Sequence, residues 1–144
     1  ARELLVGDYA VARVIARPFI GKGNGNYTRT ERRKDFSLAP TSTTLLDLVK
    51  EKGMTVAAIG KIEDIFEHRG MTVTDHTTNN HDGIEKTIDY LKKDFEGLLF
   101  TNLVDTDMIY GHRNDVKGYA EAVMYFDSKL PEIMSVMKDD DNFS

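Results

Sequence analysis

The chain has 144 residues, of which 40% are hydrophobic and 30% are charged, as expected for one soluble globular domain with a core of its own. Its formal net charge of -5 argues against a nucleic-acid partner and against an anionic membrane surface. There is no cysteine, which excludes disulfides and thiolate chemistry and favours a cytoplasmic location. No apolar run approaches the roughly 18 residues that a membrane span needs.

The two ends of the chain suggest that it is a piece of a longer protein. It begins at Ala1 rather than at a methionine, and residues 139–144 form an acidic run of the kind that stays disordered at a terminus. We therefore expect that further segments of the parent protein are missing from this chain.

The first quarter of the chain predicts one strand followed by loops. Residues 11–15, VARVI, have the β-branched side chains of a strand. Residues 20–26, IGKGNGN, combine glycine with asparagine, which is typical of a turn or loop. They lack the spacing of a phosphate-binding loop and do not lead into a helix, so we reject a nucleotide site there. Residues 27–35, YTRTERRKD, are expected to form a solvated charged loop.

The middle of the chain predicts a helix, a buried strand and a second, short helix. Residues 41–53 contain capping residues, a leucine-rich stretch and a closing glycine, as expected for a helix. Residues 55–59, TVAAI, form a short continuous apolar run, which is typical of a strand buried on both faces. Residues 62–67 favour a short helix, and the polar residues 72–81 are expected to form a long loop.

The last part of the chain predicts a helix, a strand and a long helical region. Residues 82–94 carry isoleucine and leucine on one helical stripe. Residues 98–104, LLFTNLV, are the most apolar stretch and the best candidate strand. From residue 115 to residue 137 apolar side chains recur at helical spacing, and Pro131 is expected either to kink one long helix or to start a second.

Short apolar strands that alternate with helices predict the α/β class, with a parallel sheet covered by helices on both faces. Ligands collect outside the carboxyl ends of the strands in such sheets. Two polar segments are expected at those ends, namely Gly60-Lys61 and residues 105–112.

Residues 107–112, DMIYGH, place a carboxylate and an imidazole just after a predicted strand. Divalent ions take carboxylate oxygen, and imidazole suits Mn, Fe or Zn, so Asp107 and His112 are candidate ligands of one ion. If extended backbone continues there, Asp105 shares a face with Asp107 and is either a further ligand or an orienting group for His112. The alternatives are that Asp105 caps a turn, that Asp107 is a turn former and that His112 is an ordinary loop histidine, since such a pair is common by chance.

Four basic residues are candidate phosphate contacts, because arginine forks onto phosphate oxygens and lysine supplies a point charge. They are Arg13, Arg17, Arg29 and Lys61. Lys61 is the best of them because it follows a predicted buried strand directly. Each of the four has an alternative as an ordinary surface charge.

Several segments, taken in order, closely resemble the C-terminal half of bacterial phosphopentomutases, which are members of the alkaline phosphatase superfamily. They are VARVIARPFIGKGNGNYTRT, DFSL, AAIGKIEDIF, DGIEKTIDYLKKDFEGLLFTNLVDTDMIYGHR and GYAEAVMYFDSKLPEI, and together they cover nearly the whole chain. The resemblance implies a partial alkaline-phosphatase-like core over residues 38–144. It also implies that residues 1–37 are the last part of an α/β cap domain.

The resemblance further implies a function, which is the interconversion of ribose 1-phosphate or deoxyribose 1-phosphate with the 5-phosphate. These enzymes use a phosphorylated threonine and two Mn ions, and a sugar bisphosphate such as glucose 1,6-bisphosphate primes them. Asp107 and His112 match the family's aspartate and histidine ligands of one metal ion. The positions that match contacts to the sugar phosphate are Arg13, Ile15, Arg29 and Lys61.

Two family segments have no counterpart in this chain: DTTTGHWE, which carries the threonine, and TADHGNDP, which supplies ligands of the second metal. We therefore expect the isolated chain to be inactive. Cutting a parallel sheet exposes strand edges, so we also expect the chain to self-associate or to pair with the missing segments. Two alternatives stay open. One is another phosphomutase of the superfamily, such as a cofactor-independent phosphoglycerate mutase, and the other is a non-catalytic binding or assembly module.

Overall fold

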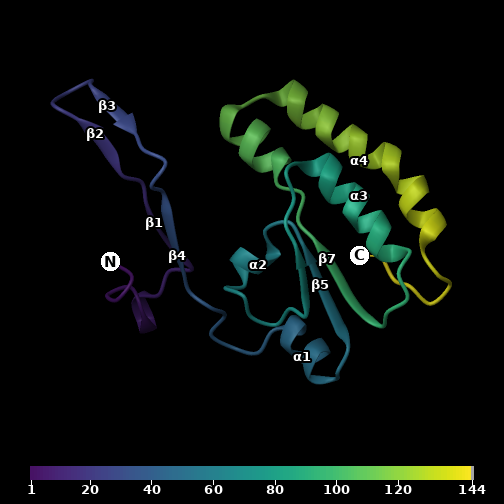
Figure 1. The fold of residues 1–144 in the computed structure, drawn as a ribbon. Helices are drawn as coiled ribbons and strands as arrows, with labels where there is room; N and C mark the ends of the chain where they lie inside the picture. Colours follow the sequence, from purple (N-terminus) through teal and green to yellow (C-terminus); the bar gives the residue numbers. More distant parts are fainter. Residues whose placement is uncertain (144) are drawn as a thin grey trace. The chain divides into compact units, whose positions relative to one another are not determined.

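The computed structural model describes residues 1–143 of the chain. The chain divides into two compact units, Ala1–Ser42 and Thr43–Ser144. The first unit consists of short antiparallel strands, and the second is an α/β unit (Figure 1). Within the described residues, no helix combines the length and the apolar character needed to cross a membrane.

The first unit contains two antiparallel strand pairs after a short 3-10 helix, η1 (Gly7–Tyr9). The predicted N-terminal strand is present as β1, and residues 22–25 form bends and turns within the turn or loop predicted over residues 20–26. The loop predicted over residues 27–35 is wrong in part, because residues 27–29 form a strand and a further strand begins at residue 34. Polar, three- and four-residue strands escape prediction because they have no apolar pattern. β1 (Arg13–Ala16) pairs with β4 (Lys34–Ser37), and β2 (Phe19–Gly21) pairs with β3 (Tyr27–Arg29).

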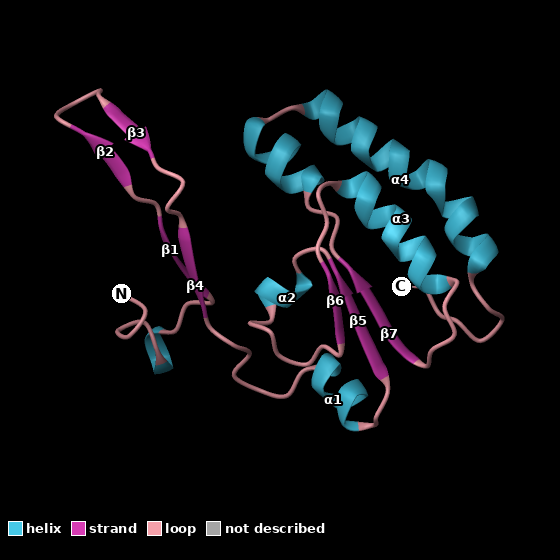
Figure 2. Cartoon of the chain, in the orientation of Figure 1, coloured by secondary structure: helices cyan, strands magenta, loops and turns pink. Residues whose placement is uncertain are grey.

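The second unit is built on a parallel sheet of three strands in the order β6-β5-β7 (Figure 2). The strands are β5 (Thr55–Ile59), β6 (Val73–Asp75) and β7 (Gly97–Thr101). The predicted parallel sheet is therefore confirmed. β6 lies inside a predicted loop, because a three-residue strand at the sheet edge needs no apolar run. β7 begins at the predicted strand but ends three residues early, because residues 102–104 are irregular and the backbone becomes helical at Asp105.

Helices cover both faces of this sheet, as the alternation of strands and helices predicts. Val56 and Ala58 of β5 pack with Leu46 and Ile62 in one buried cluster. The opposite face of the sheet meets the second pair of helices, where the Thr87 hydroxyl lies 2.7 Å from that of Thr101 on β7. The helices of the first cluster are α1 (Leu45–Glu51) and α2 (Ile62–Ile65), and those of the second are α3 (Asn80–Leu91) and α4 (Val116–Val136).

The second pair of helices has its own apolar core. Ile84 and Ile88 of α3 pack with Ile133 of α4, and all three side chains are buried. Figure 1 shows α3 and α4 lying side by side along much of their length. α4 runs through Pro131 as one helix, so no second helix begins at that proline.

α1 begins with a capping box. The Thr44 hydroxyl accepts a hydrogen bond from the Asp47 N–H, and the Asp47 carboxylate accepts one from the Thr44 N–H at 2.8 Å. This backbone hydrogen bond, the Thr44 hydroxyl and nearby Arg69 lower the pKa of Asp47. Because the pKa is lower in the folded chain, the contribution of Asp47 to stability is present above its ordinary value of 3.8 and is lost as the pH falls through the lowered value.

Candidate functional site

The DMIYGH motif lies at the carboxyl end of β7 on a tight helical segment. After β7 the backbone becomes helical at Asp105, where φ is -65° and ψ is -34°. A π-helical turn, η2 (Thr106–Tyr110), follows, and then a 3-10 turn, η3 (Gly111–Arg113). π-helical turns are rare and are frequent at functional sites. The motif therefore forms two successive helical turns, and the side chains of its first and last residues, Asp107 and His112, are exposed.

Asp107 and His112 come together on the surface of these turns. The Nε2 atom of His112 lies 3.4 Å from an Oδ atom of Asp107, and the two side chains are 73% and 77% exposed. A carboxylate oxygen and an imidazole nitrogen at this separation could both reach one divalent ion. The structure therefore brings the two predicted metal ligands together.

The donor pair fits only part of a metal site. Among residues 1–143 there is no group of three His, Cys, Asp or Glu side chains that could hold a metal ion. Catalytic metal sites usually have about three protein ligands. Asp107 and His112 alone would thus make a weak site, and a complete catalytic site would need ligands from elsewhere.

Asp105 does not lie on one extended face with Asp107. The prediction that it shares an extended face with Asp107 is wrong, because the backbone is already helical there. Asp105 is buried with 9% of its surface exposed, and its carboxylate accepts a hydrogen bond from the Asn80 N–H at 2.7 Å. It therefore caps the start of α3, a role that the sequence did not indicate.

Lys61 lies beside the same motif. It is the residue before α2, at the carboxyl end of β5, and its Nζ atom lies 2.6 Å from the sulfur of Met108. Gly60 makes this approach of the two strand ends possible: its φ is 82°, and a Cβ there would lie 2.6 Å from the carbonyl oxygen of Asn102. The structure thus joins the predicted substrate lysine to the predicted metal-binding motif.

The other predicted substrate residues belong to the first unit. Arg13 and Ile15 lie two positions apart on β1 and so share one face of that strand, while Arg29 lies on β3. Arg13 lies 3.5 Å from Asp35 on β4. The hydrogen bond from Arg33 and the charges of Arg33 and Arg13 lower the pKa of Asp35. Part of the positive charge of Arg13 is therefore balanced within its own unit.

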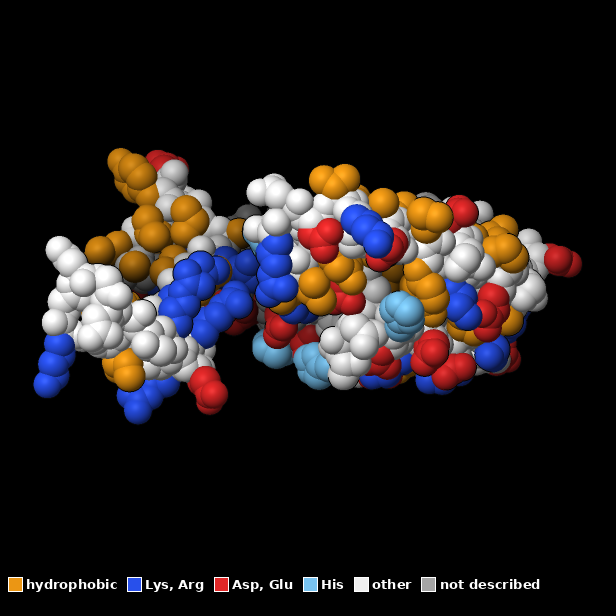
Figure 3. Space-filling model, turned by 90° about the horizontal axis from the view of Figure 1, so that it is seen from above, with side chains coloured by type: hydrophobic (Ala, Val, Ile, Leu, Met, Phe, Trp, Pro, Cys, Tyr) orange, Lys and Arg blue, Asp and Glu red, His pale blue; other side chains and the backbone are white. Residues whose placement is uncertain are grey.

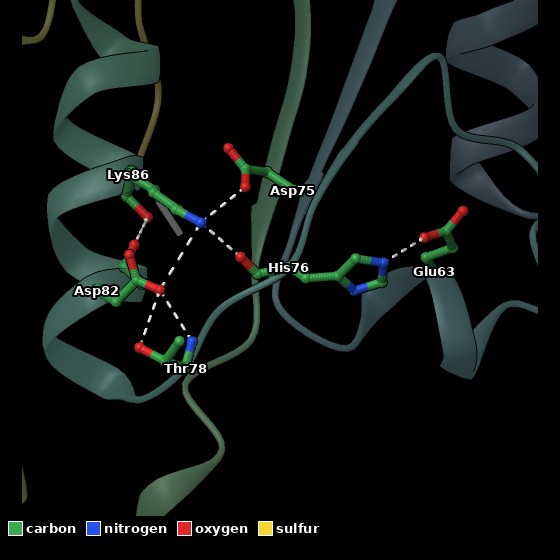
Figure 4. A network of polar contacts seen from close by, with 8 residues as sticks. Glu63, Asp75, His76, Thr78, Asp82 and Lys86 are labelled. Carbon is green, nitrogen blue, oxygen red and sulfur yellow. Dashed lines mark hydrogen bonds and ion pairs between the residues drawn. The ribbon is translucent and has the colours of Figure 1, made fainter.

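A polar network lies at the carboxyl end of β6 (Figure 4). Lys86 of α3 contacts Asp75 at 2.8 Å and Asp82 at 3.7 Å, and Asp82 also accepts a hydrogen bond from the Thr78 N–H at 2.8 Å. Lys86 further donates to the carbonyl oxygen of His76. The network ties the loop after β6 to the first turns of α3.

Glu63 of α2 is flanked by two imidazoles. Its carboxylate lies 3.0 Å from Nδ1 of His68 and 3.3 Å from Nε2 of His76 (Figure 4 shows the His76 contact). His68 has a φ of 60°, which is unusual for a residue with a side chain. The hydrogen bond with Glu63 lowers the pKa of Glu63 and raises that of His68.

We expect His68 to titrate above its ordinary pKa of 6.5. Replacing Glu63 by glutamine removes the negative charge, so the pKa of His68 in E63Q should fall toward that value. Because the pKa is raised by folding, the contribution of this contact to stability is fully present below pH 6.5 and is lost as the pH rises through the raised value. An NMR titration of the imidazole protons measures the pKa. The control is D64N, because Asp64 raises the pKa of His68 less than Glu63 does. The pKa of His68 should therefore move less in D64N than in E63Q. Equal shifts in the two variants would contradict Glu63 as the main cause of the raised pKa.

A large hollow among the described residues lies away from the DMIYGH motif. It has a volume of about 1040 Å³ and lies along β7 and between α3 and α4, where Leu99, Phe126 and Ile133 line it. No described strand pairs with the outer edge of β7. The hollow is therefore a groove beside an unpaired strand edge, which is a surface that a further strand or helix could cover.

Sequence reasoning missed three residues of this site. The first is Asn80, which hydrogen-bonds to Asp105. The second is Met108, which contacts Lys61. The third is Gly118, against which the ring of Tyr110 packs. Asn79, directly before α3, was a signal for a helix start. Nothing in the sequence indicated which distant residue that start would contact.

Comparison with known proteins gives consistent matches. A family model described as Metalloenzyme superfamily matches residues 21–143. A phosphopentomutase of Acetivibrio thermocellus is 59% identical to this chain over 141 residues, which are 98% of this chain and 36% of that protein. Phosphopentomutases of Clostridioides difficile and Clostridium acetobutylicum are 55% and 57% identical over the same share. The chain thus spans about a third of the length of these curated relatives.

Proposed function

This chain belongs to the Metalloenzyme superfamily, and on that premise we propose that it is part of a phosphopentomutase. Such an enzyme interconverts ribose 1-phosphate or deoxyribose 1-phosphate with the corresponding 5-phosphate. The observation that carries the proposal is the contact of Lys61 with Met108, a residue of the same motif as the Asp107–His112 pair, at the carboxyl ends of two adjacent parallel strands. The 59% identity to a protein named phosphopentomutase supports it.

Each candidate residue has a role in this proposal. Asp107 and His112 hold one of two Mn ions through a carboxylate oxygen and an imidazole nitrogen. A bound divalent ion neutralises charge on a transferred phosphoryl group. The ammonium group of Lys61, beside the same motif, contacts the substrate, and the residues of the first unit that contact the sugar phosphate are Arg13, Ile15 and Arg29. In this assignment residues 1–37 end the cap domain and residues 38–144 belong to the core.

The remaining parts of the site lie outside this chain in our proposal. The phosphorylated threonine, the ligands of the second Mn ion and a further ligand of the first come from other segments of the longer protein. A bisphosphate such as glucose 1,6-bisphosphate primes the threonine. The unpaired edge of β7 and the groove beside it support the proposed pairing with those segments. We assign the protein to the cytoplasm, since the sequence contains no cysteine.

The proposal is tested by assaying the chain in two forms. The isolated chain should show no turnover of ribose 1-phosphate with Mn and glucose 1,6-bisphosphate, because it lacks a nucleophile. The same chain, put in place of the matching 141 residues of the Acetivibrio thermocellus phosphopentomutase, should give a protein, called here the exchanged protein, that produces ribose 5-phosphate. Turnover by the isolated chain would contradict the need for other segments. A well-folded exchanged protein that acts on phosphoglycerate and not on pentose phosphates would contradict the proposed substrate.

A further inference from the structure

Asn80 and Asp105 are buried polar residues that bind each other across the α/β unit. They are 7% and 9% exposed, and they are 25 positions apart in the sequence. The Asn80 N–H donates to the Asp105 carboxylate at 2.7 Å, and the Asp105 N–H donates to the side-chain oxygen of Asn80 at 2.9 Å. The side-chain NH2 of Asn80 also donates to the Thr106 hydroxyl at 3.3 Å. Buried polar groups that are paired in this reciprocal way fix a single local geometry.

The pair joins the start of α3 to the start of η2. Asn80 is the first residue of α3, where N–H groups lack partners within the helix. The Asp105 carboxylate satisfies one of these groups and carries a negative charge, which is favourable at a helix N-terminus. The side-chain oxygen of Asn80 in turn accepts from the residue at which β7 gives way to the helical turn. The pair thereby sets the direction in which the chain leaves the sheet.

A second contact holds the other end of η2. The ring of Tyr110 lies over Gly118 of α4, so closely that a Cβ at Gly118 would lie 2.3 Å from the ring. The Asp115 N–H also donates to the carbonyl oxygen of Tyr110 at 3.0 Å. The segment with Asp107 is therefore fixed at both ends, by α3 before it and by α4 after it. Asp107 lies between these two anchors and His112 lies two residues after the second, and both side chains are exposed.

We propose that Asn80 and Asp105 are positioning residues that orient Asp107 and His112 for metal binding. This inference rests on the proposed function, in which Asp107 and His112 are ligands. The Asp105 carboxylate is buried and already paired with Asn80, so it supports the ligand-bearing turn and does not join the ligands. Removing residues that orient metal ligands typically lowers metal affinity by about 10- to 100-fold.

The test uses the 144-residue chain with Mn²⁺ as the probe and two readouts. The first is the Mn²⁺ concentration that broadens the His112 imidazole signals in NMR spectra, which detects weak binding. The second is amide hydrogen exchange of residues 106–112 without metal. N80A should need at least about 10-fold more Mn²⁺ for equal broadening, and its amides in this segment should exchange faster. The matched control is N79A, which removes the ordinary side-chain cap of the same helix, a bond of 2.9 Å to the Asp82 N–H. It should leave both readouts close to those of the unchanged chain.

Each outcome decides one claim. Unchanged broadening and unchanged exchange in N80A would overturn the positioning role. If Mn²⁺ does not broaden the His112 signals of the unchanged chain, metal binding by the isolated chain is overturned. Faster amide exchange of residues 106–112 in N80A would then still support the positioning role. If N80A loses the exchange protection of β5 as well, the variant D105N replaces it. D105N removes the charge at the start of α3 and weakens the bond from the Asn80 N–H. Faster exchange confined to residues 106–112 together with weaker Mn²⁺ broadening of His112 would support the positioning role, and unchanged values of both would overturn it.

Discussion

Replacing Asp107 by asparagine is expected to lower the mutase activity of the exchanged protein by more than about 100-fold. Removing a residue that hydrogen-bonds to a metal ligand typically lowers metal affinity or activity by about 10- to 100-fold. Removing the ligand itself should therefore lower the activity further. Asparagine keeps the size of the side chain and removes its charge. Because the Asp107 side chain is 77% exposed and its polar contact among residues 1–143 is with the exposed His112, the folded structure should not change.

The control for this prediction is D127N, which removes an exposed carboxylate on α4 far along the chain from the motif. Its activity should equal that of the exchanged protein. The measurement is the initial rate of ribose 5-phosphate formation at saturating Mn, with circular dichroism to establish folding. A rate for D107N within about threefold of the control would show that Asp107 is not a ligand needed for the reaction.

Replacing Ile59 by alanine is expected to lower the free energy of unfolding of the chain by about 2–5 kcal/mol. Ile59 is fully buried on the central strand of the sheet, where it pairs with Asp75 of β6 and Thr101 of β7. Alanine leaves a cavity that neighbours on both sides cannot fill without moving the strands. A domain with about 5–15 kcal/mol of stability would lose a large part of it.

Urea unfolding measures this loss. The control I65A truncates an isoleucine of α2 that is 52% exposed, and its free energy of unfolding should change by less than about 1 kcal/mol. Equal losses in the two variants would contradict the central position of Ile59. The same substitution should also increase amide exchange at Lys61, because Gly60 and Lys61 follow Ile59 directly at the candidate site.

Apolar patterns predicted the core of the fold and failed for its short polar strands. The run TVAAI predicted β5 because both of its faces are buried, with Val56 and Ala58 toward α1 and α2. Strand β6, by contrast, has only three residues, two of them exposed, and it exists because its backbone pairs with β5. Such pairing is a property of the assembled sheet, so no local pattern could indicate it.

The candidate site was predictable in its residues and not in its geometry. The position of DMIYGH after an apolar strand placed Asp107 and His112 at the correct end of the sheet. The shared face of Asp105 and Asp107 depended on an extended backbone, but the backbone is helical at Asp105, whose N–H donates to the side-chain oxygen of Asn80. That bond joins residues that are far apart in the sequence, and for the same reason the contact between Lys61 and Met108 could not be foreseen.

The central claim is that Asp107 and His112 together hold one metal ion of a two-metal site. The most direct measurement is the Mn content of the exchanged protein, by mass spectrometry of the metal after removal of free ions. We predict that the double variant D107N/H112A contains one Mn ion fewer per protein than the unchanged exchanged protein. Equal Mn contents in the two proteins would contradict the claim.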